Sequence, residues 1–350
     1  MSRSILVCLE IHKRDIACGD IAEFQGLALA LMLEPVLVIK KKIRQINRSN
    51  LIGEDLLSYL KKVIAENKDA VIIFNVDLLP IQQRNIEQYT CAKVIDNSEL
   101  ILNIFASRAK SFEGKLQVEL AQLKHQSSRL IRTWTHLERQ KGGIGLRAGP
   151  GEKQLESDRR IIREKIAKIE QKLKKVVQTR TQNRQKRAKN KMPIVALVGY
   201  TNAGKSTIFN ALSKKNILVK DMLFASLDTA SANVYLAENK HCVVIDTVGF
   251  INNLPTALLN AFKSTLEEII YADLVIHVVD YADKSYEEHS NTVNKILQEI
   301  GAGLVPRVIA YNKIDLVPDK PPILTQNDIA ISAERGDITV LTDILCKKLY

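Results

Sequence analysis

Eight residues near the middle of the chain have the spacing of a phosphate-binding loop, Gly199-Tyr-Thr-Asn-Ala-Gly-Lys-Ser206. They follow an apolar run at 194–198 and precede a stretch that fits a helix, 206–213. In such a strand–loop–helix unit, N–H groups of the loop and of the helix N-terminus surround an anion. Lys205 would reach the β- and γ-phosphates, and the Ser206 hydroxyl would ligate Mg²⁺. The residues expected to contact a nucleotide here are Gly199, Tyr200, Thr201, Asn202, Ala203, Gly204, Lys205 and Ser206.

A second motif, Asp246-Thr-Val-Gly249, follows an expected strand at 242–245. A carboxylate at this strand end, opposite the phosphate-binding loop, can hold Mg²⁺ directly or through a water molecule. Gly249 has no Cβ, so its amide can approach a γ-phosphate closely. The motif adds four expected contact residues, which are Asp246, Thr247, Val248 and Gly249.

A third motif, Asn312-Lys-Ile-Asp315, follows an expected strand at 308–311 and selects the base. The Asp315 carboxylate can accept two parallel hydrogen bonds, which guanine offers from N1–H and its 2-amino group and adenine does not. Asn312 would brace the loop, and the Lys313 stem would cover the base. Three motifs in this order, each at a strand end, predict GTP or GDP. The expected contacts are Asn312, Lys313, Ile314, Asp315, Ser332, Ala333 and Glu334.

A loop that responds to the γ-phosphate is expected between Lys214 and the next strand at 233–237. Ser226 or Thr229 would supply the hydroxyl that senses Mg²⁺ and the γ-phosphate. An order–disorder change of this loop on hydrolysis would act as a switch. The expected contacts are Phe224, Ala225, Ser226, Leu227 and Asp228, with Ser206, Ser226 and Asp246 around the metal.

The residue after Gly249 is Phe250, at the position where Ras-type GTPases place a Gln that orients the attacking water. A phenylalanine cannot orient water, and it can equally be a packing residue. We therefore expect slow intrinsic hydrolysis of GTP to GDP and phosphate, with a group from a partner completing the site. Lys205, Gly249 and Phe250 form the expected catalytic set.

Strands that alternate with helices must position these motifs, which predicts a doubly wound, mostly parallel six-stranded sheet in a domain at 193–350. Its expected strands are 194–198, 233–237, 242–245, 274–279, 308–311 and 329–331, and its helices are 206–213, 258–270, 285–300 and 337–348. A small α/β domain is expected at 1–106. Its expected strands are 4–10, 35–39, 71–74 and 92–95, and its helices are 20–32 and 54–65.

The segment between these domains, 107–192, changes to a heptad-like period. Two apolar stripes predict helices that pair as an antiparallel hairpin. The first stripe is Leu116, Leu120, Leu123, Ser127, Leu130, Trp134 and Leu137, and the second is Ile162, Ile166, Ile169, Leu173 and Val176. A glycine-rich tip at 142–151 joins them; it is either a floppy linker or a loop that moulds onto a partner. The basic run at 180–191 is either a solvated hinge or a direct contact to phosphates.

The net charge of +12 is concentrated in this middle segment. Residues 106–192 hold 24 lysines and arginines against 8 aspartates and glutamates, a net of +16, whereas the rest of the chain carries −4. Positive charge this concentrated indicates a polyanionic partner, and nucleic acid is favoured over an acidic membrane. The chain contains no run of eighteen apolar residues, so no membrane-spanning helix is expected. Its five cysteines are scattered and form no CxxC motif, which fits a reducing cytoplasm.

These motifs together resemble the HflX family of ribosome-associated GTPases over nearly the whole chain, more weakly before Val71. The resemblance rests on Leu116-Gln-Val-Glu-Leu-Ala-Gln-Leu123, Gly142-Gly-Ile-Gly-Leu-Arg147, Gly149-Pro-Gly-Glu152, Asp158-Arg-Arg160, Asp246-Thr-Val-Gly-Phe-Ile251, Thr265-Leu-Glu-Glu268, His277-Val-Val-Asp280, Asn312-Lys-Ile-Asp315 and the phosphate-binding loop. It implies an α/β N-terminal domain, a helical hairpin and a GTP-binding domain. It also implies GTP-dependent binding to the large ribosomal subunit, with separation of stalled ribosomes or a part in assembly.

The chain departs from the family pattern at several positions. Ser226 stands where members usually carry Thr, so the hydroxyl remains but the methyl that fixes its rotamer is lost. Thr229 replaces a Pro, and Asp96-Asn-Ser98 replaces Asp-Arg-Thr. Many members continue past the GTP-binding domain, so the resemblance implies that a further C-terminal domain is absent after Tyr350.

Two other readings compete with a ribosome-associated GTPase. One is a GTP-gated RNA-binding module in which hydrolysis serves only as a timer. The other is a membrane-surface GTPase, which the narrow, paired stripes of the hairpin disfavour because they leave no aromatic-rich face for lipid. Rescue, biogenesis and dormancy are not distinguished by these residues. We expect a cytoplasmic monomer with rRNA of the large subunit as the partner of the hairpin.

Overall fold

The structure is a computed structural model that describes residues 2–11, 21–44, 46–134, 150–189, 192–213, 223–224, 230–238, 240–252, 266–318, 328–336 and 338–350. For residues 130–134, 150–155 and 183–189 it describes the backbone alone. The chain divides into two compact units, 1–107 with 118–172 and 108–117 with 173–350. The expected domain boundaries after residues 106 and 192 stay a prediction.

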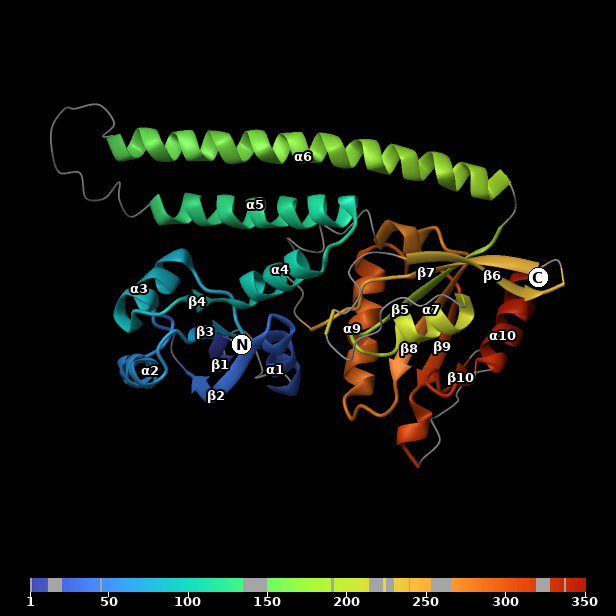
Figure 1. The fold of residues 1–350 in the computed structure, drawn as a ribbon, viewed down its shortest axis with the longest axis horizontal. Coiled ribbons are helices and arrows are strands. Elements are labelled where there is room, and N and C mark those ends of the chain that lie inside the picture. Colours follow the sequence, from blue (N-terminus) through green and yellow to red (C-terminus); the bar gives the residue numbers. More distant parts are fainter. Residues whose placement is uncertain are drawn as a thin grey trace. The chain divides into compact units, whose positions relative to one another are not determined.

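The first unit contains a four-stranded parallel sheet in the order β2-β1-β3-β4 (Figure 1). Its strands are β1 (Ser2–Ile11), β2 (Leu33–Ile43), β3 (Val71–Phe74) and β4 (Val94–Ile95). Residues 4–9 of β1 are buried without alternation, which is typical of a parallel strand covered on both faces. The expected small α/β domain is confirmed, and its described sheet is parallel throughout.

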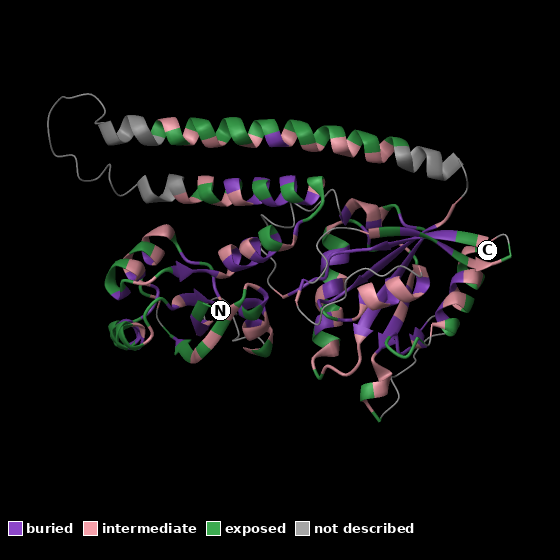
Figure 2. Cartoon of the chain, viewed as in Figure 1, coloured by how far each residue is buried: buried purple, intermediate pink, exposed green. Residues whose placement is uncertain are grey.

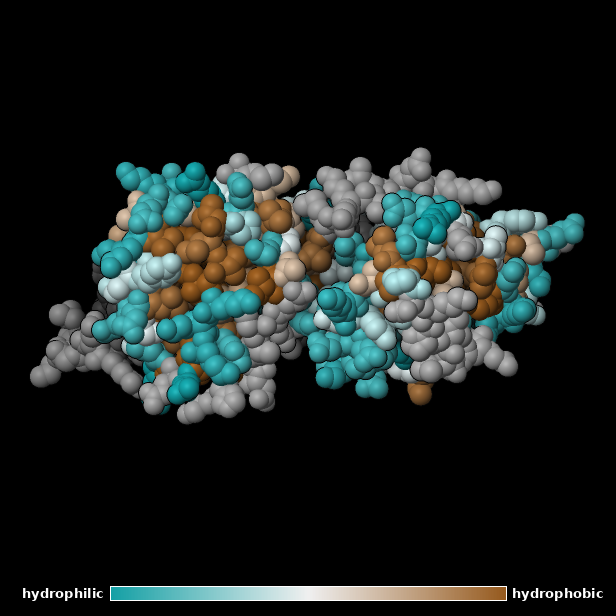
Figure 3. Space-filling view, turned by 90° about the horizontal axis from the view of Figure 1, so that it is seen from below, coloured by the Kyte–Doolittle hydropathy of each residue, from teal (hydrophilic) through white to brown (hydrophobic). Residues whose placement is uncertain are grey.

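Three helices connect these strands, α1 (Ile21–Ala30), α2 (Glu54–Glu66) and α3 (Pro80–Thr90), and α4 (Asn97–Arg108) follows β4. In α2 the buried residues are spaced at helical period, since Leu56, Leu60 and Val63 face the core. Part of the surface of this unit is apolar, as Figure 3 shows, and Leu29 and Met32 are among its exposed side chains. Surface of this kind is typical of regions that contact another surface.

The middle segment forms two long helices, α5 (Phe112–Trp134) and α6 (Pro150–Lys189), which confirm the expected hairpin (Figure 1). Glu170 accepts an ion pair from Lys124 at 2.9 Å, and Glu113 accepts one from Arg180 at 2.7 Å. From the first ion pair to the second, the residue number falls along α5 and rises along α6, so the two helices run antiparallel. Buried stripe residues are Leu116, Leu120, Leu123 and Ile169. Most of the tip at 142–151 lies outside the described residues.

Arg129 of α5 forms the main polar contact of the hairpin within the first unit. Its guanidinium pairs with the carboxylate of Asp96, at the end of β4, and reaches Glu99 of α4 at 3.5 Å. Asp96 is 1% exposed, and its carboxylate also accepts the N–H groups of Leu78 and Glu99. Burial raises the pKa of Asp96, and the Arg129 charge opposes that rise. Arg129 therefore compensates a carboxylate that is out of contact with water.

The second unit contains a six-stranded sheet in the order β10-β9-β8-β5-β7-β6. Its strands are β5 (Ile194–Gly199), β6 (Ala230–Ala237), β7 (Lys240–Asp246), β8 (Leu274–Asp280), β9 (Arg307–Asn312) and β10 (Asp328–Ala330). Every neighbouring pair is parallel except β6 with β7, which is antiparallel with Ala230 opposite Asp246. The expected doubly wound sheet is confirmed, and β6 begins three residues before the expected strand.

Helices cover both faces of this sheet. Val195 and Leu197 of β5 share one core with buried residues of α7 (Lys205–Ser213) and α10 (Thr339–Leu349). Helix α9 (Tyr286–Glu299) packs against β5 and β8, on the opposite face by the alternation of side chains. A short 3₁₀ turn, Ile314–Leu316, follows β9. Of the expected helix at 258–270, only 266–270 lie among the described residues, and they are helical.

The inner strands of both sheets are largely buried, the edge strands β2 and β6 are partly exposed, and the helices expose one side (Figure 2). Parallel order places the carboxyl ends of β5, β7, β8 and β9 at the same edge of the second sheet. All three sequence motifs begin at that edge. Among the described helices, none is both long enough and apolar enough to cross a bilayer.

Candidate nucleotide-binding site

The phosphate-binding loop, Gly199–Ser206, turns between β5 and α7 as its spacing predicts. A Cβ at Gly199 would lie 2.3 Å from the Val278 carbonyl oxygen, so the backbones of β5 and β8 approach too closely for a side chain. Gly204 has φ +93°, and a Cβ there would lie 2.1 Å from Asn312 Nδ2. A side chain is therefore excluded at Gly199 by the neighbouring backbone, and at Gly204 by the Asn312 side chain and the positive φ angle.

Asn312 connects three of the predicted contact segments. Its Nδ2 donates to the Ala203 carbonyl at 2.9 Å, and its Oδ1 accepts the Ala333 N–H at 3.0 Å. The residue is buried, so neither hydrogen bond competes with water. The structure thus brings the phosphate loop, the Asn312–Asp315 segment and the Ser332–Glu334 turn together at one edge of the sheet. The bracing role expected of Asn312 agrees with this geometry.

Lys205 is buried, and its Nζ donates to the carbonyls of Gly199 at 3.2 Å and Tyr200 at 2.7 Å. Burial lowers the pKa of Lys205 to about 8, while the nearby Asp246 carboxylate acts in the opposite direction. An ammonium group has three N–H donors, and two of them hold Lys205 to the loop, so a third could bind the phosphate oxygen that the sequence predicts. The protein therefore pre-positions a cation where the sequence places the β- and γ-phosphates.

Asp246 and Ser206 form the part of the site that fits Mg²⁺. The Ser206 hydroxyl donates to Asp246 Oδ2 at 2.7 Å, and Asp246 Oδ1 is buried with no hydrogen-bond partner among the described residues. Burial raises the pKa of Asp246, although the Ser206 hydrogen bond and the Lys205 charge lower it. A hydroxyl beside a carboxylate with an unsatisfied oxygen is the hard oxygen donor set that Mg²⁺ prefers. Thr247 anchors the motif by donating to the Leu197 carbonyl at 2.6 Å.

The carboxylate expected to recognise the base, Asp315, is held by a neighbouring hydroxyl. The Ser332 hydroxyl donates to Asp315 Oδ1 at 2.6 Å, and this hydrogen bond lowers the pKa of Asp315. An ionised carboxylate is the state needed to accept two N–H groups of guanine. Lys313 has φ +65°, and its Nζ pairs with Asp280 Oδ2 at 2.6 Å.

The residues expected around the γ-phosphate are only partly among the described residues. Phe224 is buried, but Ala225, Ser226, Leu227 and Asp228 lie outside the described residues, so the metal role of Ser226 stays a prediction. Phe250 is 2% exposed, and its side chain is therefore enclosed by protein. This burial is compatible with the packing role that the sequence leaves open for Phe250.

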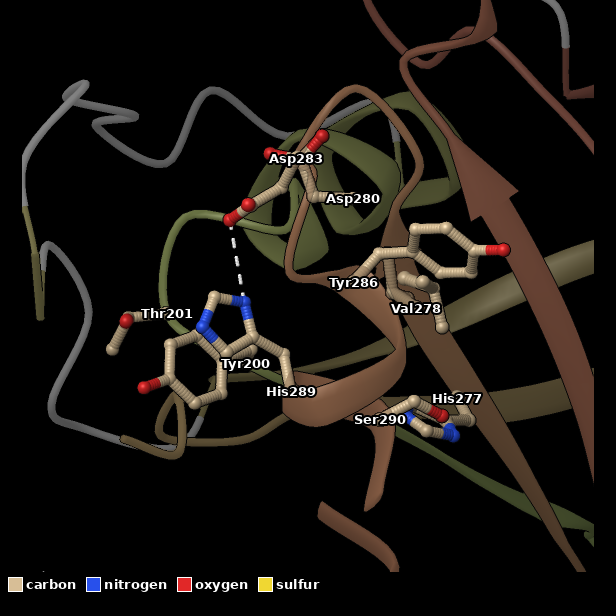
Figure 4. A pocket seen from close by; sticks show the side chains of 10 residues that line it. Tyr200, Thr201, His277, Val278, Asp280, Asp283, Tyr286, His289 and Ser290 are labelled. Atoms are coloured by element: carbon tan, nitrogen blue, oxygen red, sulfur yellow. Dashed lines mark ion pairs between the residues drawn. The ribbon is translucent and has the colours of Figure 1, made fainter. Parts of the chain in front are cut away.

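Tyr200 and Thr201, both expected contact residues, line a pocket beside the phosphate loop together with residues that sequence reasoning missed (Figure 4). The ring of Tyr200 stacks on that of His289, with centroids 3.7 Å apart and planes 9° from parallel. Asp280, at the end of β8, pairs with Lys313; its position as a strand-end carboxylate was the available signal. His277 of β8 is buried, which lowers its pKa to about 3 and keeps it neutral.

Models of three protein families match the chain in succession. They are described as GTP-binding GTPase N-terminal, over residues 19–106, GTP-binding GTPase Middle Region, over 108–187, and 50S ribosome-binding GTPase, over 194–313. The chain is also similar to a crystal structure of a GTP-binding protein from the archaeon Sulfolobus solfataricus in complex with GDP. That match has a TM-score of 0.51 at 23% identity and covers 100% of this chain and 99% of the other, so it supports the fold alone.

Two relatives match at higher identity. The GTPase HflX of Alkalihalophilus pseudofirmus is 45% identical over 331 residues, which span 94% of this chain and 78% of that protein. The GTPase HflX of Escherichia coli strain K12 is 44% identical over 323 residues, which span 91% of this chain and 76% of that protein. Since similarity of this degree extends through the hairpin and both sheets, the chain belongs to the HflX family of GTPases.

Proposed function

We propose that the protein binds GTP and GDP with Mg²⁺ and hydrolyses GTP to GDP and phosphate. The observation that supports this most directly is the Asn312 side chain, which joins the phosphate loop to the Ser332–Glu334 turn. A single amide between these segments fixes the distance between a base site and a phosphate site. That separation is what recognition of a whole guanine nucleotide requires.

Five of the predicted residues have defined roles in this proposal. Lys205 would use its remaining N–H to bind the phosphates, and Asp315 would accept the guanine N–H groups. Ser206 and Asp246 would hold Mg²⁺, with the metal bound to Asp246 through a water molecule; when bound, the ion neutralises phosphate charge and polarises a phosphoryl oxygen. Ser226 would add a hydroxyl that responds to the γ-phosphate.

The enclosed Phe250 supports a slow intrinsic reaction, because the position that orients water in Ras-type enzymes carries a hydrocarbon ring. Hydrolysis would become fast only when a partner orders the loops or supplies a charged group. The same observation favours a second candidate, a GTP-gated RNA-binding module in which hydrolysis is only a timer. In that case one bound GTP would suffice for one full cycle of partner binding.

The partner in this proposal is the large ribosomal subunit, bound through the hairpin in the cytoplasm. The family description of the second unit, 50S ribosome-binding GTPase, and the net charge of +16 within 106–192 both support it. Lys172, Lys174 and Lys175 of α6 are exposed and available for phosphate contacts. Ribosome splitting, rescue of stalled ribosomes and biogenesis are the outcomes that such GTP-dependent binding would serve.

Nucleotide binding is tested with Lys205→Ala, which should lose tight binding of GTP and GDP in equilibrium titrations with Mg²⁺. Circular dichroism of the variant checks that the fold is retained. Turnover is then measured with and without large subunits, and stimulation by the subunits is expected. Tight binding by a folded Lys205→Ala protein would contradict the phosphate-loop assignment, and full turnover without subunits would contradict partner activation.

The ribosome contact is tested by replacing Lys172, Lys174 and Lys175 with Gln. Removing phosphate contacts reduces the salt dependence of binding, so a plot of log affinity against log salt should become flatter by up to about three in slope. A charge-matched control replaces Lys40, Lys41 and Lys42 of β2, which are also exposed. Equal slopes for the α6 variant and the wild type would show that these three lysines do not contact the RNA.

A further inference from the structure

The phosphate loop is paired with the segment that follows Gly249 by two main-chain hydrogen bonds. The Thr201 N–H donates to the Phe250 carbonyl at 2.8 Å, and the Phe250 N–H donates to the Gly199 carbonyl at 3.1 Å. Together they make a short parallel bridge between Tyr200 and Phe250, which we call the Tyr200–Phe250 bridge. The bridge joins a phosphate-binding element directly to a γ-phosphate-sensing element.

The Tyr200–Phe250 bridge engages main-chain groups that a third phosphate would need. The Thr201 N–H belongs to the loop whose amides face an anion, and Phe250 already accepts it. Gly249 lies against the same loop: a Cβ there would be 2.9 Å from Thr201 Cα and 3.1 Å from Lys205 Nζ. A γ-phosphoryl group that reached Lys205 and this amide would have to displace Gly249 and Phe250. A diphosphate has no γ-phosphoryl group and does not meet this obstacle.

The Tyr200 side chain holds the far end of the same segment. Its hydroxyl accepts the Asn252 N–H at 2.8 Å, two residues beyond the bridge. Asn252 Oδ1 lies 2.8 Å from the Thr292 hydroxyl of α9, which also lies 3.0 Å from the Glu288 carbonyl. Residues 250–252 are therefore fixed at both ends, by the backbone of residues 199–201 and by the hydroxyl of Tyr200.

Helix α9 in turn fixes the Tyr200 ring. Figure 4 shows the ring lying flat on His289, whose Nδ1 is 3.2 Å from Asp283 Oδ2. Stacking on the His289 ring restricts the Tyr200 rotamer and so directs its hydroxyl toward Asn252. One side chain of the phosphate loop thus connects the γ-phosphate-sensing segment with α9.

We propose that Tyr200 is a positioning residue that sets the preference of this site for nucleoside diphosphate over triphosphate. Its hydroxyl stabilises the Tyr200–Phe250 bridge, with which a diphosphate is compatible and a triphosphate is not. Binding of GTP breaks the bridge and releases Asn252 from Tyr200 and Thr292, so the identity of the nucleotide reaches α9. This inference rests on the proposed function and specifies how the site distinguishes its two ligands.

The test measures affinities of fluorescent N-methylanthraniloyl derivatives of GDP and of the non-hydrolysable GTP analogue GMPPNP. Tyr200→Phe keeps the ring on His289 and removes only the acceptor for Asn252. Loss of one hydrogen bond should raise the GMPPNP affinity about fivefold and change the GDP affinity by less than about twofold. The matched control is Tyr286→Phe, whose hydroxyl bonds to Glu287, and it should alter neither affinity.

Thr292→Val tests the same connection without touching the phosphate loop, and it should also favour GMPPNP. Since both changes act through Asn252, the double variant should gain less than the product of the two single effects. Equal changes for GDP and GMPPNP in Tyr200→Phe, or no change in either, would overturn the inference, because a merely structural role affects both nucleotides alike. A wild-type protein that binds neither derivative would instead refute the proposed function, and the inference with it.

Discussion

The Asn312 amide nitrogen occupies the space that a side chain at position 204 would need, since a Cβ on Gly204 would come within 2.1 Å of it. The same nitrogen donates to the Ala203 carbonyl. Gly204→Ala must therefore push the Asn312 side chain away and break this hydrogen bond. We expect at least a tenfold loss of GDP affinity in equilibrium titrations.

A control for this variant separates the clash from the backbone conformation. Gly301, beyond the end of α9, has φ +85°, close to the +93° of Gly204, but a Cβ there meets nothing within 4 Å. Gly301→Ala should cost about 1 kcal/mol of stability from its φ angle and leave GDP affinity unchanged. Equal losses of affinity in both variants would show that strain alone, and not Asn312, explains the effect.

Asp315→Asn should change the preferred base. The amide offers one acceptor and one donor where the carboxylate offers two acceptors. Xanthine matches this pattern, because it keeps N1–H and carries a carbonyl in place of the 2-amino group. Competition of GDP and xanthosine diphosphate for the variant should favour the latter by at least tenfold, and continued preference for GDP would contradict the assignment of Asp315.

The stability of the nucleotide-free protein should depend on pH through Lys205. Its pKa of about 8 in the folded state lies below the ordinary 10.5, so the unfolded state binds more protons between these values. Stability of the wild type should therefore rise with pH in this window, relative to Lys205→Met, which lacks the titrating group. At pH 7 the variant should be more stable by roughly 1–3 kcal/mol.

Thermal unfolding of the two proteins without nucleotide, from pH 7 to 9.5, measures this difference. The difference in stability between Lys205→Met and the wild type should decrease steadily above about pH 8. A second comparison with Lys295→Met, at an exposed position on α9, controls for the loss of any lysine. A gap between Lys205→Met and wild type that stays constant with pH would contradict the buried ammonium.

Removing Arg129 should leave Asp96 as a buried, uncompensated carboxylate. Arg129→Met should therefore lose about 3 kcal/mol at pH 7, measured by urea unfolding with Trp134, the chain's single tryptophan, as the probe. The raised pKa of Asp96 fixes the sign of the pH effect: protonation relieves the penalty, so the loss should shrink as the pH falls from 7 toward 5.

The double variant Arg129→Met with Asp96→Asn tests the cause. It removes the charge together with its partner, so the pH dependence of the loss should disappear and the loss at pH 7 should be smaller. If the single variant loses the same stability at every pH, the contact acts through packing of the arginine stem and not through charge.

The sequence predicts the parts of the site that short motifs encode. The glycines, Lys205 and Asp315 follow strand ends, and a parallel sheet brings strand ends to one edge, so their grouping could be expected without coordinates. Long-range contacts carry no such pattern. Tyr200 and His289 are 89 residues apart, and nothing in either neighbourhood indicates that their rings stack.

Element boundaries were harder to predict where tertiary contacts decide them. Strand β6 begins at Ala230 because Ala230 pairs with Asp246, although small and polar residues at 230–232 give little strand signal. Helix α3 has the mostly polar sequence PIQQRNIEQYT, and Ile86 is its one fully buried apolar side chain. Its packing on the core stabilises a helix that periodicity alone did not reveal.

The single antiparallel pair of the second sheet makes β6 and β7 one ribbon with both nucleotide-sensing segments at its open end. The chain enters β6 at Ala230 directly after the 224–229 stretch and leaves β7 at Asp246, opposite Ala230. A slip of the ribbon by two residues would move these segments in opposite directions while preserving which side chains face the core. The turn near Glu238, at the opposite end of the ribbon from Ala230 and Asp246, is therefore a place where an insertion that shifts the register by two residues would displace both segments at once.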